Sequence, residues 1–572
     1  MKTLLVAVNS QYVHTNLAVL YLKAASSKAG IDVKVLQFSV NEGLKQIFGG
    51  IVREKPDVVA FSCYVWNIEY VVKLIEDIKK ADSGIVVIAG GPEISFDNGG
   101  LLSGHAGVDF LIGGEGEEKL PFLLKLLMEG KRPDKNENEW LMGYSVIEDL
   151  NQLPSPYLYI YKGSLKHKIA YLETTRGCPF HCAFCISSVS GGVRTFNPER
   201  VYRALEELVE SGSEVIKFVD RTFNANEKRV LDILNHILKF SQKRVVFHFE
   251  IAPEILTEKT ILKLADMPPG LVQIEAGIQS IHDETLGEVE RFSRVDIAFT
   301  NLQRILSMGN IHLHVDLIAG LPFETYPRFK ESFNRVYGLF THHFQLGFLK
   351  LLRGTALREK SEHYGYRYRN YPPYEIISNR CLSANEVLVL KDIEACLDLF
   401  YNSGRIVITL KWIHYMLSGI EYFDFYEKLA YWMRTNGYLD KPMKVSDLYE
   451  ILHIFIKKNF PVLPEGIIEC MRFDYLRSMK NPSIPAFMRK EEDAARKRRN
   501  KKKVIEYRTE LEQVLPRLKK IPMNDILHQI YVTTFKLPRE AGIPADSDIA
   551  FDFGDICPVT GFSGTYQLGA KT

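Results

Sequence analysis

The sequence is poor in cysteine, carries almost no net charge and has no long apolar run. Its 572 residues include 8 cysteines, too few for a disulfide framework in a chain of this size, which indicates a reducing, cytoplasmic compartment. The formal net charge of +2 provides no strong field that would attract nucleic acid or a charged surface. No apolar stretch reaches about 18 residues, so we expect no membrane-spanning helix and no membrane partner.

The beginning of the sequence also lacks the pattern of a secretory signal. Only Lys2 precedes the apolar residues that continue to Asn9, and no cleavage site of small residues follows them. These residues instead predict a buried strand. Because one domain takes about 150 residues on average, the length of the chain predicts three or four domains.

Short apolar strands alternate with amphipathic helices over residues 1–130. Strands that follow one another through intervening helices require a parallel sheet covered on both faces. The predicted strands are residues 3–9, 32–38, 57–63, 85–89 and 108–112, and the predicted helices are residues 16–29, 41–53, 68–80 and 117–128. Ligands of such sheets bind outside the carboxyl ends of the strands, where the loops 9–15, 62–67, 90–95 and 113–117 lie.

A second series of strands and helices begins at residue 169, after a polar and irregular segment, residues 131–166, that we interpret as a linker. Its strands are expected at residues 169–174, 215–220, 245–250, 271–278, 312–319 and 344–351. Asn197 and Pro198 form a cap and first-turn pair that starts one of the helices between them. Six such repeats predict a partial (β/α)6 barrel over residues 167–365, with its chemistry at the carboxyl ends of the strands.

Residues 366–572 are predicted to form a mainly helical domain, rich in aromatic side chains that we interpret as core. We find no catalytic motif in this sequence segment, and residues 551–561 carry no assignment. A basic run from Arg496 to Lys503 is interpreted as a solvated helix face or a loop. A nucleic-acid contact is the alternative for this run, but we do not expect nucleic acid as a partner.

Three of the eight cysteines, Cys178, Cys182 and Cys185, lie in one short segment after the first strand of the predicted barrel. The spacing C-x3-C-x2-C supplies three thiolates, whereas a tetrahedral metal or a four-iron cluster needs four ligands. One position therefore stays open for a small molecule. The alternative is three core thiols that lie close together by chance, which the interleaved Phe180 and Phe184 and the preceding strand make a weak explanation.

This segment resembles the cysteine motif of the radical S-adenosylmethionine (radical SAM) enzymes, and the resemblance covers residues 167–360. It implies that Cys178, Cys182 and Cys185 bind a [4Fe–4S] cluster whose fourth iron binds the amino and carboxylate groups of SAM. In this family, reductive cleavage of SAM yields a 5′-deoxyadenosyl radical that abstracts hydrogen from the substrate. The resemblance also implies an external low-potential electron donor, such as a flavodoxin or a ferredoxin.

Later strand ends are similar to looser motifs of the same family. The segment from Glu275 to Ser280 is similar to the Glu-x-Gly-x-Gln-Ser segment of the coproporphyrinogen-type radical SAM enzymes. This implies that Glu275, Gln279 and Ser280 bind the ribose hydroxyls and the methionyl part of SAM. Asp316 and Gly320 belong to a segment that resembles the family's strand-five region near adenine, and Gly320 permits a close approach because it has no Cβ.

The second and third strands of the predicted barrel end in charged residues. Asp220, Arg221 and Glu250 are the candidate catalytic residues, and Asp220 is also the expected acceptor for the SAM ammonium. The Gly-Gly-Glu that the family usually has at this position is absent, and the alternative is that Asp220 caps the following helix. Glu250 is expected at the barrel mouth, where a carboxylate can bind SAM or act on the substrate. An ion pair with Arg176 or Arg221 is the alternative for Glu250.

The sheet of residues 1–130, placed before such a barrel, is similar to the Rossmann-like domain of the cobalamin-binding class of radical SAM enzymes. Three loops at successive strand ends, residues 62–67, 90–95 and 113–117, carry this similarity, and glycines in the last two let the backbone close on a large flat ligand. The resemblance implies cobalamin contacts from Ser62, Tyr64, Trp66, Gly90, Gly91, Glu93, Gly114, Glu115 and Gly116.

The Asp-x-His-x-x-Gly motif, which replaces the lower axial base of the cobalt in other cobalamin domains, is absent from the loop after the first strand. His14 in that loop is a candidate cobalt ligand, and an ordinary surface or hydrogen-bonding histidine is its alternative. Because the motif is usually absent from the radical SAM cobalamin class, its absence here leaves the cobalamin prediction in place.

Together these features imply a cobalamin-dependent radical SAM enzyme that methylates an unactivated carbon. A radical cyclisation or rearrangement without net methyl transfer uses the same cofactors and is the first alternative. RNA modification, with the basic run 496–503 as a docking patch, and a cofactor-binding sensor are the further alternatives.

Overall fold

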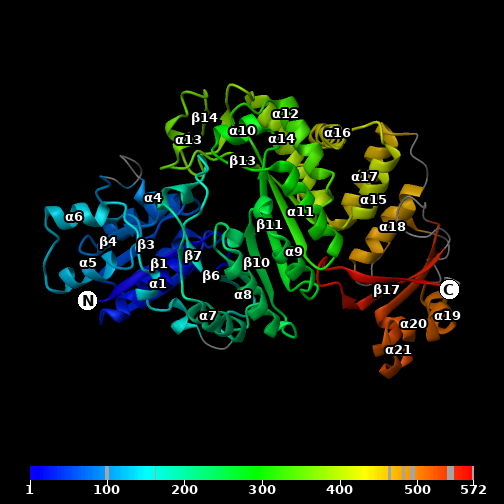
Figure 1. Ribbon diagram of the computed structural model, residues 1–572, viewed down its shortest axis with the longest axis horizontal. Coiled ribbons are helices and arrows are strands. Elements are labelled where there is room, and N and C mark those ends of the chain that lie inside the picture. Colours follow the sequence, from blue (N-terminus) through cyan, green and yellow to red (C-terminus); the bar gives the residue numbers. More distant parts are fainter. Residues whose placement is uncertain are drawn as a thin grey trace. The chain divides into compact units, whose positions relative to one another are not determined.

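The structure is a computed structural model that describes residues 1–96, 102, 104–160, 163–461, 466–479, 484–489, 496–536 and 547–569. The chain divides into two compact units, whose elements are labelled in Figure 1. The first unit comprises Met1–Ile305, Gly320–Glu324 and Phe348–Ser383. The second unit comprises Leu306–Ala319, Thr325–Gly347 and Ala384–Thr572.

A parallel sheet of five strands opens the first unit. The strands are β1 (Thr3–Asn9), β2 (Val33–Ser39), β3 (Val58–Ser62), β4 (Val86–Gly90) and β5 (Phe110–Ile112). Their order is β2-β1-β3-β4-β5, and Leu5 of β1 lies opposite Val35 of β2 and Ala60 of β3. The expected parallel sheet is confirmed. Its strand order reverses between β1 and β3, so ligands are expected at the carboxyl ends of these two strands.

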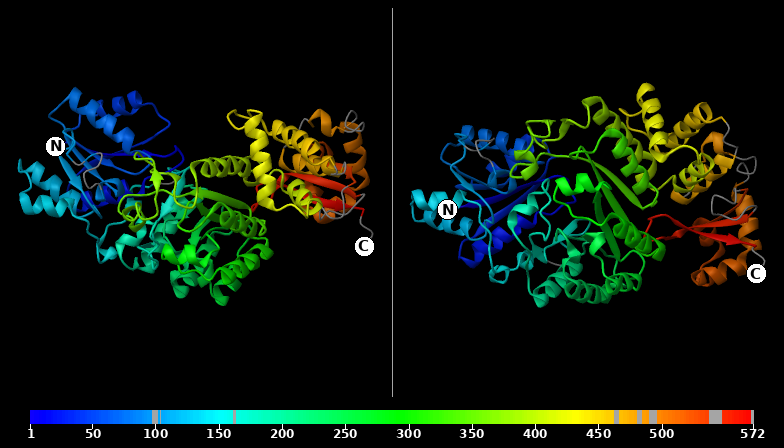
Figure 2. Two further views of the ribbon diagram at one scale, coloured as in Figure 1. Left: turned by 90° about the horizontal axis from the view of Figure 1, so that it is seen from above. Right: turned by 45° about the horizontal axis from the view of Figure 1, so that its top comes forward.

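Helices lie on both faces of this sheet, as Figure 2 shows. They are α1 (Leu17–Lys28), α2 (Leu44–Val52), α3 (Ile68–Ala81), α4 (Pro92–Ser95) and α5 (Lys119–Met128). Side chains of β1 enter two cores in alternation: Leu4, Val6 and Val8 belong to the core with α2 and α3. Leu5 and Ala7 belong to the core with α1 and α5. Because β1 is buried on both faces, its sequence is uniformly apolar.

The segment after this sheet is more regular than expected. Helix α6 (Lys135–Met142) begins with a capping box, in which Asp134 accepts from the Glu137 N–H and Glu137 accepts from the Asp134 N–H. Leu141 anchors the helix in the core below α5 and α1. Two 3-10 helices follow, η1 (Leu150–Gln152) and η2 (Pro156–Tyr159). The expectation of an irregular segment is wrong for residues 135–142, because their polar side chains form a helix cap.

Four further strands of the first unit are parallel neighbours. They are β6 (Ile169–Leu172), β9 (Val215–Phe218), β10 (Val246–Ile251) and β11 (Val272–Gln279), in the order β11-β10-β9-β6. The register pairs His248 with Lys217 and Glu250 with Glu275. The helices that follow the strands are α7 (Pro198–Glu210), α8 (Glu227–Ile237), α9 (Glu258–Ala265), α10 (Asp283–Glu288) and α11 (Val295–Met308). Helix α7 starts at Pro198 with Asn197 at the N-cap position, as predicted, although the Asn197 side chain makes no capping hydrogen bond.

Short elements surround the cysteine segment. Strand β7 (Thr175–Arg176) pairs antiparallel with β8 (Arg194–Thr195), so residues 177–193 form a loop closed by this two-stranded ladder. Helix α13 (Ala356–Glu359) contacts the loop, since the Leu357 N–H donates to the Ala183 carbonyl at 2.9 Å. Strands β14 (Arg367–Tyr368) and β15 (Ile376–Ser378) form an antiparallel pair.

The second unit contains β12 (His312–Ala319), α12 (Tyr326–Tyr337) and β13 (His343–Phe348), at the positions expected for the last two barrel strands; Phe348 belongs to the first unit. The expected mainly helical region follows and is confirmed. Its helices are α14 (Ala384–Cys396), α15 (Val407–Met416), α16 (Tyr422–Thr435), α17 (Val445–Asn459), α18 (Gly466–Ser478), α19 (Arg496–Glu506), α20 (Arg508–Val514) and α21 (Met523–Gln529). No helix of the described residues is both long and apolar enough to cross a bilayer.

A three-stranded antiparallel sheet near the C-terminus was not expected. It consists of β16 (Ile530–Phe535), β17 (Ser547–Ile556) and β18 (Ser563–Leu568), so part of the unassigned segment 551–561 is a strand. The basic run lies on α19, as the helix-face interpretation requires. Asn500 of this helix donates to the Ile530 carbonyl and accepts from the Val532 N–H, both at 2.9 Å. Lys503 pairs with Asp548 of β17.

Candidate functional site

A cavity of about 770 Å³ lies in the first unit, at the carboxyl ends of the strands of both parallel sheets. Loops after β1, β3, β4 and β5 line one side, which we call the sheet wall. Residues at the ends of β6, β9 and β10 and in the cysteine loop line the other side, which we call the barrel wall. Every residue predicted to contact cobalamin except Glu93 lines the cavity, namely His14, Ser62, Tyr64, Trp66, Gly90, Gly91, Gly114, Glu115 and Gly116.

Two glycines shape the sheet wall through their backbone. Gly91 has φ +113°, and a Cβ at this position would lie 2.6 Å from the Cys63 carbonyl oxygen. Gly114 has φ +67°, and its Cβ would lie 2.3 Å from the Ser145 carbonyl oxygen. Both positions therefore require glycine, because the conformation and the neighbouring backbone each exclude a side chain. The sequence indicated that glycines let the backbone close on a ligand. In the structure, Gly91 and Gly114 closely approach neighbouring protein backbone.

An aromatic pair forms a flat part of the sheet wall. The rings of Tyr64 and Trp66 are stacked, with centroids 4.3 Å apart and planes 6° apart. The Trp66 indole N–H donates to the Val8 carbonyl at 3.2 Å, which fixes the ring over the end of β1. Burial raises the pKa of Tyr64 to about 12, so its hydroxyl is neutral and can donate a hydrogen bond.

His14 lines the cavity and contacts the barrel. Its Nδ1 lies 2.6 Å from the Tyr171 hydroxyl of β6, which leaves Nε2 as the other ring nitrogen. Burial, with the charge of Lys217 as a second cause, lowers the pKa of His14, so the imidazole is neutral at pH 7. A neutral imidazole is the form that binds a metal. The Ile169 N–H also donates to the Val13 carbonyl at 2.8 Å, which holds this loop against β6.

Glu93 does not line the cavity. Its buried carboxylate accepts a hydrogen bond from the Tyr374 hydroxyl at 2.6 Å and lies 3.9 Å from Arg353. Both partners belong to the segment that carries α13 and β15, which sequence reasoning had no means to place beside residue 93. The predicted cobalamin contact of Glu93 stays a prediction without support from its position.

The three cysteines are free thiols on the loop between β7 and β8. Gly177, which precedes Cys178, has φ +90°, and a Cβ there would lie 1.9 Å from the Gly192 carbonyl oxygen. Burial raises the pKa of Cys182, the charge of Arg291 opposes this, and Cys185 and Cys178 add to the rise. Cys178 and Cys185 are therefore near enough to Cys182 to influence the pKa of its thiol.

Sequence reasoning missed Arg291, which contacts this motif. Its Nη1 donates to the Cys182 sulfur at 3.8 Å, and its Nη2 donates to the Gly277 carbonyl at 2.6 Å. The Ala183 N–H donates to the Val289 carbonyl at 2.9 Å, so the backbone before Arg291 also holds the cysteine loop. Hydrogen bonds to cluster sulfurs are among the features that set the reduction potential of iron–sulfur clusters.

Lys217 of the barrel wall lies between two carboxylates, of which Glu250 lines the cavity and Glu275 does not. Lys217 lies 3.2 Å from Glu250 and 3.1 Å from Glu275, and His248 lies 3.0 Å from the same Glu275 oxygen. Burial opposes the charge of Lys217, but Glu250 and Glu275 raise its pKa above the usual value. Glu250, Lys217 and Arg221 line the cavity. Glu250 pairs with Lys217, whereas the alternative based on the sequence was an ion pair with Arg176 or Arg221.

Asp220 follows β9 and contacts the residues after the end of β6. It is 1% exposed and accepts hydrogen bonds from the hydroxyls of Thr174, at 2.8 Å, and Thr175. Burial raises the pKa of Asp220, which the two hydroxyls oppose. Asn226 caps the following helix α8, since its side chain accepts from the Arg229 N–H at 3.1 Å. The capping alternative for Asp220 is therefore wrong.

None of the predicted SAM contacts, Asp220 and Glu275 included, is among the residues that line the cavity. The Ser280 hydroxyl donates to Glu324 at 2.7 Å, and Gln279 has φ +69°, rare for a residue other than glycine. Gly320 has φ +98°, and a Cβ there would lie 2.7 Å from the Ile376 side chain. Asp316 belongs to the second unit and lies 2.8 Å from His314. Their roles in binding SAM stay predictions.

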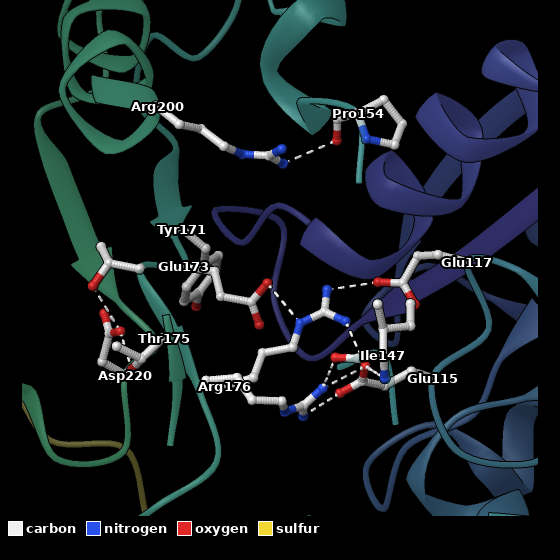
Figure 3. A network of polar contacts seen from close by, with 12 residues as sticks. Glu115, Glu117, Ile147, Pro154, Tyr171, Glu173, Thr175, Arg176, Arg200 and Asp220 are labelled. Carbon is white, nitrogen blue, oxygen red and sulfur yellow. Dashed lines mark hydrogen bonds and ion pairs between the residues drawn. The ribbon is translucent and has the colours of Figure 1, made fainter. Parts of the chain in front are cut away.

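Figure 3 shows a network of charged groups at the edge of the cavity. Arg176 lies 2.6 Å from Glu117, 3.0 Å from Glu173 and 3.2 Å from Glu115. Arg194 binds both oxygens of Glu115, at 2.6 and 3.0 Å. These partners are up to 79 residues apart in the chain, so no local pattern in the sequence signals the pairing.

Three family models match the chain. A B12 binding domain model matches residues 3–124, and a radical SAM superfamily model matches residues 172–336. A model described as a protein of unknown function (DUF4080) matches residues 362–543. The first two models cover the sheet domain and most of the predicted barrel, the parts of the chain whose loops form the cavity.

The cobalamin-dependent radical SAM methyltransferase TokK of Streptomyces tokunonensis is 28% identical over 358 residues, which cover 57% of this chain and 51% of TokK. The chain thus spans about half the length of the curated relatives it matches, such as TokK.

Two solved structures share the fold. The cobalamin-dependent S-adenosylmethionine radical enzyme OxsB, with aqua-cobalamin and S-adenosylmethionine bound, aligns with a TM-score of 0.56 and 17% identity over 83% of this chain and 79% of OxsB. The radical S-adenosylmethionine methyltransferase TsrM from Kitasatospora setae, with cobalamin and a [4Fe–4S] cluster bound, aligns with a TM-score of 0.54 and 17% identity over 65% of this chain and 79% of TsrM. The chain therefore combines a B12-binding domain with a domain of the radical SAM superfamily.

Proposed function

We propose that the protein is a cobalamin-dependent radical SAM enzyme that methylates an unactivated carbon. The observation that carries the proposal is the shared cavity. Loops of the B12-binding domain form one wall of it, and Gly177, Ile186 and Ser190 of the cysteine loop contribute to the other. A corrin on the sheet wall would then share this half-open cavity with the cysteine loop, whose three cysteines lie near the lining residues in the chain but are not themselves among them.

The residues present fit both cofactors. A cavity of about 770 Å³ is within the range of about 300–1,000 Å³ for ligand pockets, and the stacked Tyr64 and Trp66 offer a flat surface to a flat ring. Three free thiols on one loop match the ligand set of a cluster with one open iron. When bound, the cluster with SAM supplies a carbon radical, and cobalamin supplies a methyl group.

The residues of the chain position and shield these groups. Neutral His14, held by Tyr171, can offer Nε2 to the cobalt from the sheet wall. Lys217 and Glu250 present one positive and one negative group to the cavity, and either can orient a polar substrate. Asp220, Glu275, Gln279, Ser280, Asp316 and Gly320 remain the proposed SAM-binding residues. Arg221 lines the cavity and remains a proposed catalytic residue.

Relatives support methylation over a cyclisation or rearrangement. TokK and TsrM are both described as methyltransferases, whereas OxsB is described as a radical enzyme. A cyclisation or rearrangement would leave the substrate without an added methyl group and would form no S-adenosylhomocysteine. Analysis of products by mass spectrometry, after anaerobic incubation with cell extract, SAM and methylcobalamin, separates the two reactions.

The protein is proposed to act in the cytoplasm with an external low-potential electron donor, such as a flavodoxin or a ferredoxin. All eight cysteines lie in described parts of the chain and none forms a disulfide. Free thiols next to a cluster motif favour a reducing compartment.

Cys182→Ala tests the proposal. Because Cys182 is buried in the loop and supplies one of three thiolates, its loss is expected to abolish iron loading and 5′-deoxyadenosine formation. Binding of hydroxocobalamin, followed by its visible spectrum, is expected to persist. Cys381→Ala, which removes a free thiol outside the motif, is the matched control. Continued cleavage of SAM by the Cys182 variant would contradict the cluster assignment, and a wild-type protein without corrin affinity would contradict the cobalamin assignment.

A further inference from the structure

Two arginines connect the cysteine loop to the B12-binding domain. Arg176 of β7 and Arg194 of β8 are directly paired in the ladder that closes the loop. Both guanidinium groups contact Glu115, which lies in the loop after β5 of the B12-binding domain. The ladder that closes the cysteine loop is therefore also joined, through these ion pairs, to the loop that lines the sheet wall (Figure 3).

The contacts of Arg176 leave it little freedom. Its three nitrogens contact three different carboxylates, Glu173 on its own side and Glu115 and Glu117 across the cavity edge. Its guanidinium also lies over the Tyr21 ring of α1, 5.0 Å from the centroid. A planar group with several fixed donors holds its partners in both distance and angle, which a lysine cannot do.

Glu115 is held with similar rigidity. Arg194 binds it in a bidentate manner, and the Ile147 N–H donates to it at 2.7 Å. Arg194 also donates to the Ile147 carbonyl at 2.5 Å. The segment after α6 is thus part of the same network of contacts, and three hydrogen bonds orient the Glu115 carboxylate.

The network is shielded from solvent and close to charge balance. The side chains of Arg176, Arg194 and Glu117 are 11%, 11% and 8% exposed, so dissolved salt screens them little. Three carboxylates face two guanidinium groups. Burial, opposed by Arg176, raises the pKa of Glu173 to about 7, so one of the three is partly protonated at neutral pH.

We propose that Arg176 and Arg194 are positioning residues that set the distance and orientation between the corrin and the iron–sulfur cluster. The proposal rests on the proposed function, since it requires both cofactors. Transfer of a group between a radical and a corrin depends on geometry, and a displacement of about 1 Å far from the chemistry can cost about 100-fold in rate. Arg176 and Arg194 join the two loops that carry the cofactors. None of the described interactions of Arg176 is with a cysteine thiol.

Arg176→Met tests this role in the protein loaded with iron–sulfur cluster and hydroxocobalamin. After reduction, the cluster accelerates the spin relaxation of cob(II)alamin by an amount that depends on their separation, which electron paramagnetic resonance measures. We expect the wild type to show a single, narrow distribution of cob(II)alamin relaxation rates. The variant should bind iron and corrin as the wild type does but lose this narrow distribution. Formation of 5′-deoxyadenosine, which needs only cluster and SAM, is expected within about twofold of the wild type.

Two further variants keep the test decisive. Arg200→Met is the matched control, because Arg200 donates to the Pro154 carbonyl at 3.1 Å and has no carboxylate among its contacts in Figure 3. Glu117→Gln keeps the shape of the side chain and weakens only the link across the cavity edge. Glu117→Gln is expected to broaden the distribution of relaxation rates even if Arg176→Met fails to fold. Arg176→Lys is expected to restore little of the narrow distribution.

The outcomes separate this inference from the proposed function. A wild-type protein that shows no cob(II)alamin or cluster signal counts against the proposed function. A loaded wild type with the same relaxation behaviour as Glu117→Gln overturns the positioning role alone. A broadening that is equally large in Arg200→Met also overturns it, because the effect would then be a general loosening of the fold.

Discussion

The two walls of the cavity are built by different means. The sheet wall is shaped by backbone, since Gly91 and Gly114 are tightly packed against neighbouring carbonyl groups. The barrel wall is shaped by charged side chains, since Lys217 joins Glu250 and Glu275 across three strands. One wall therefore determines the form of the space, and the other determines its electrostatics. Damage to one wall should leave the cofactor of the other in place.

Matched glycine variants give the largest expected effects. Gly91→Ala places a Cβ 2.6 Å from the Cys63 carbonyl oxygen, in a backbone conformation that is almost restricted to glycine, so we expect loss of hydroxocobalamin binding with normal iron content. Gly177→Ala places a Cβ 1.9 Å from the Gly192 carbonyl oxygen and should give the reverse result, loss of iron with normal corrin binding. Absorbance titration and iron analysis measure the two quantities.

Gly30→Ala is the control for these variants. Gly30 also has a positive φ, +78°, but no atom lies within 4 Å of the added Cβ. It should cost only about 1 kcal/mol of stability and leave both cofactors bound. If Gly91→Ala and Gly177→Ala lose both cofactors together, the two walls are not independent and the comparison fails.

The difference between a wall shaped by backbone and a wall shaped by charged side chains also explains which features could be predicted from the sequence. The glycine loops and the cysteine spacing are local patterns, and residues 62–67, 90–95 and 113–117 were all expected at strand ends, where they lie. Glu93 was grouped with them because of its place in the chain, yet its carboxylate turns to Tyr374, 281 residues away. Strand positions were also accessible, because a strand buried on both faces is uniformly apolar.

The charged pairs were not accessible to sequence reasoning. The alternative for Glu250 was an ion pair with an arginine, but strand register places Lys217 and Glu275 on the same side of the sheet. Arg291 contacts Cys182 over a separation of 109 residues. Such partners depend on which residues the folded backbone brings together, and many arginines and lysines of the chain are equally plausible from composition alone. The helix at residues 135–142 was missed because its capping box has the composition of a loop.

Lys217→Met tests the barrel wall and is expected to have an intermediate effect. The substitution leaves Glu250 and Glu275 without the cation between them, while their side chains are 26% and 23% exposed. Breaking a buried pair costs about 3–5 kcal/mol and an exposed pair about 0–1, so we expect a loss of about 2 kcal/mol in unfolding free energy. Urea-induced unfolding measures it.

Two variants accompany the lysine substitution. Glu250→Gln in the Lys217→Met background removes one of the uncompensated charges and should recover about half of the loss, because the two effects are coupled. Lys73→Met, at an exposed position on α3, should change stability by less than about 0.5 kcal/mol. Equal losses of unfolding free energy in Lys217→Met and in the double variant would show that the lysine does not stabilise the protein by compensating the charge of Glu250. Corrin affinity should be unaffected in all three proteins.

Trp66→Ala is expected to have the smallest effect and sharpens the comparison from the sheet side. Stacked aromatic pairs contribute about 0.5–1.5 kcal/mol beyond the area they bury, so corrin affinity should fall by about two- to tenfold, with unchanged iron content. Trp140→Ala is the control, since Trp140 is 42% exposed, similar to 44% for Trp66, and does not line the cavity. An affinity that stays the same in Trp66→Ala would mean that backbone alone forms the binding surface of this wall. The glycine positions would then account for the whole shape of the site.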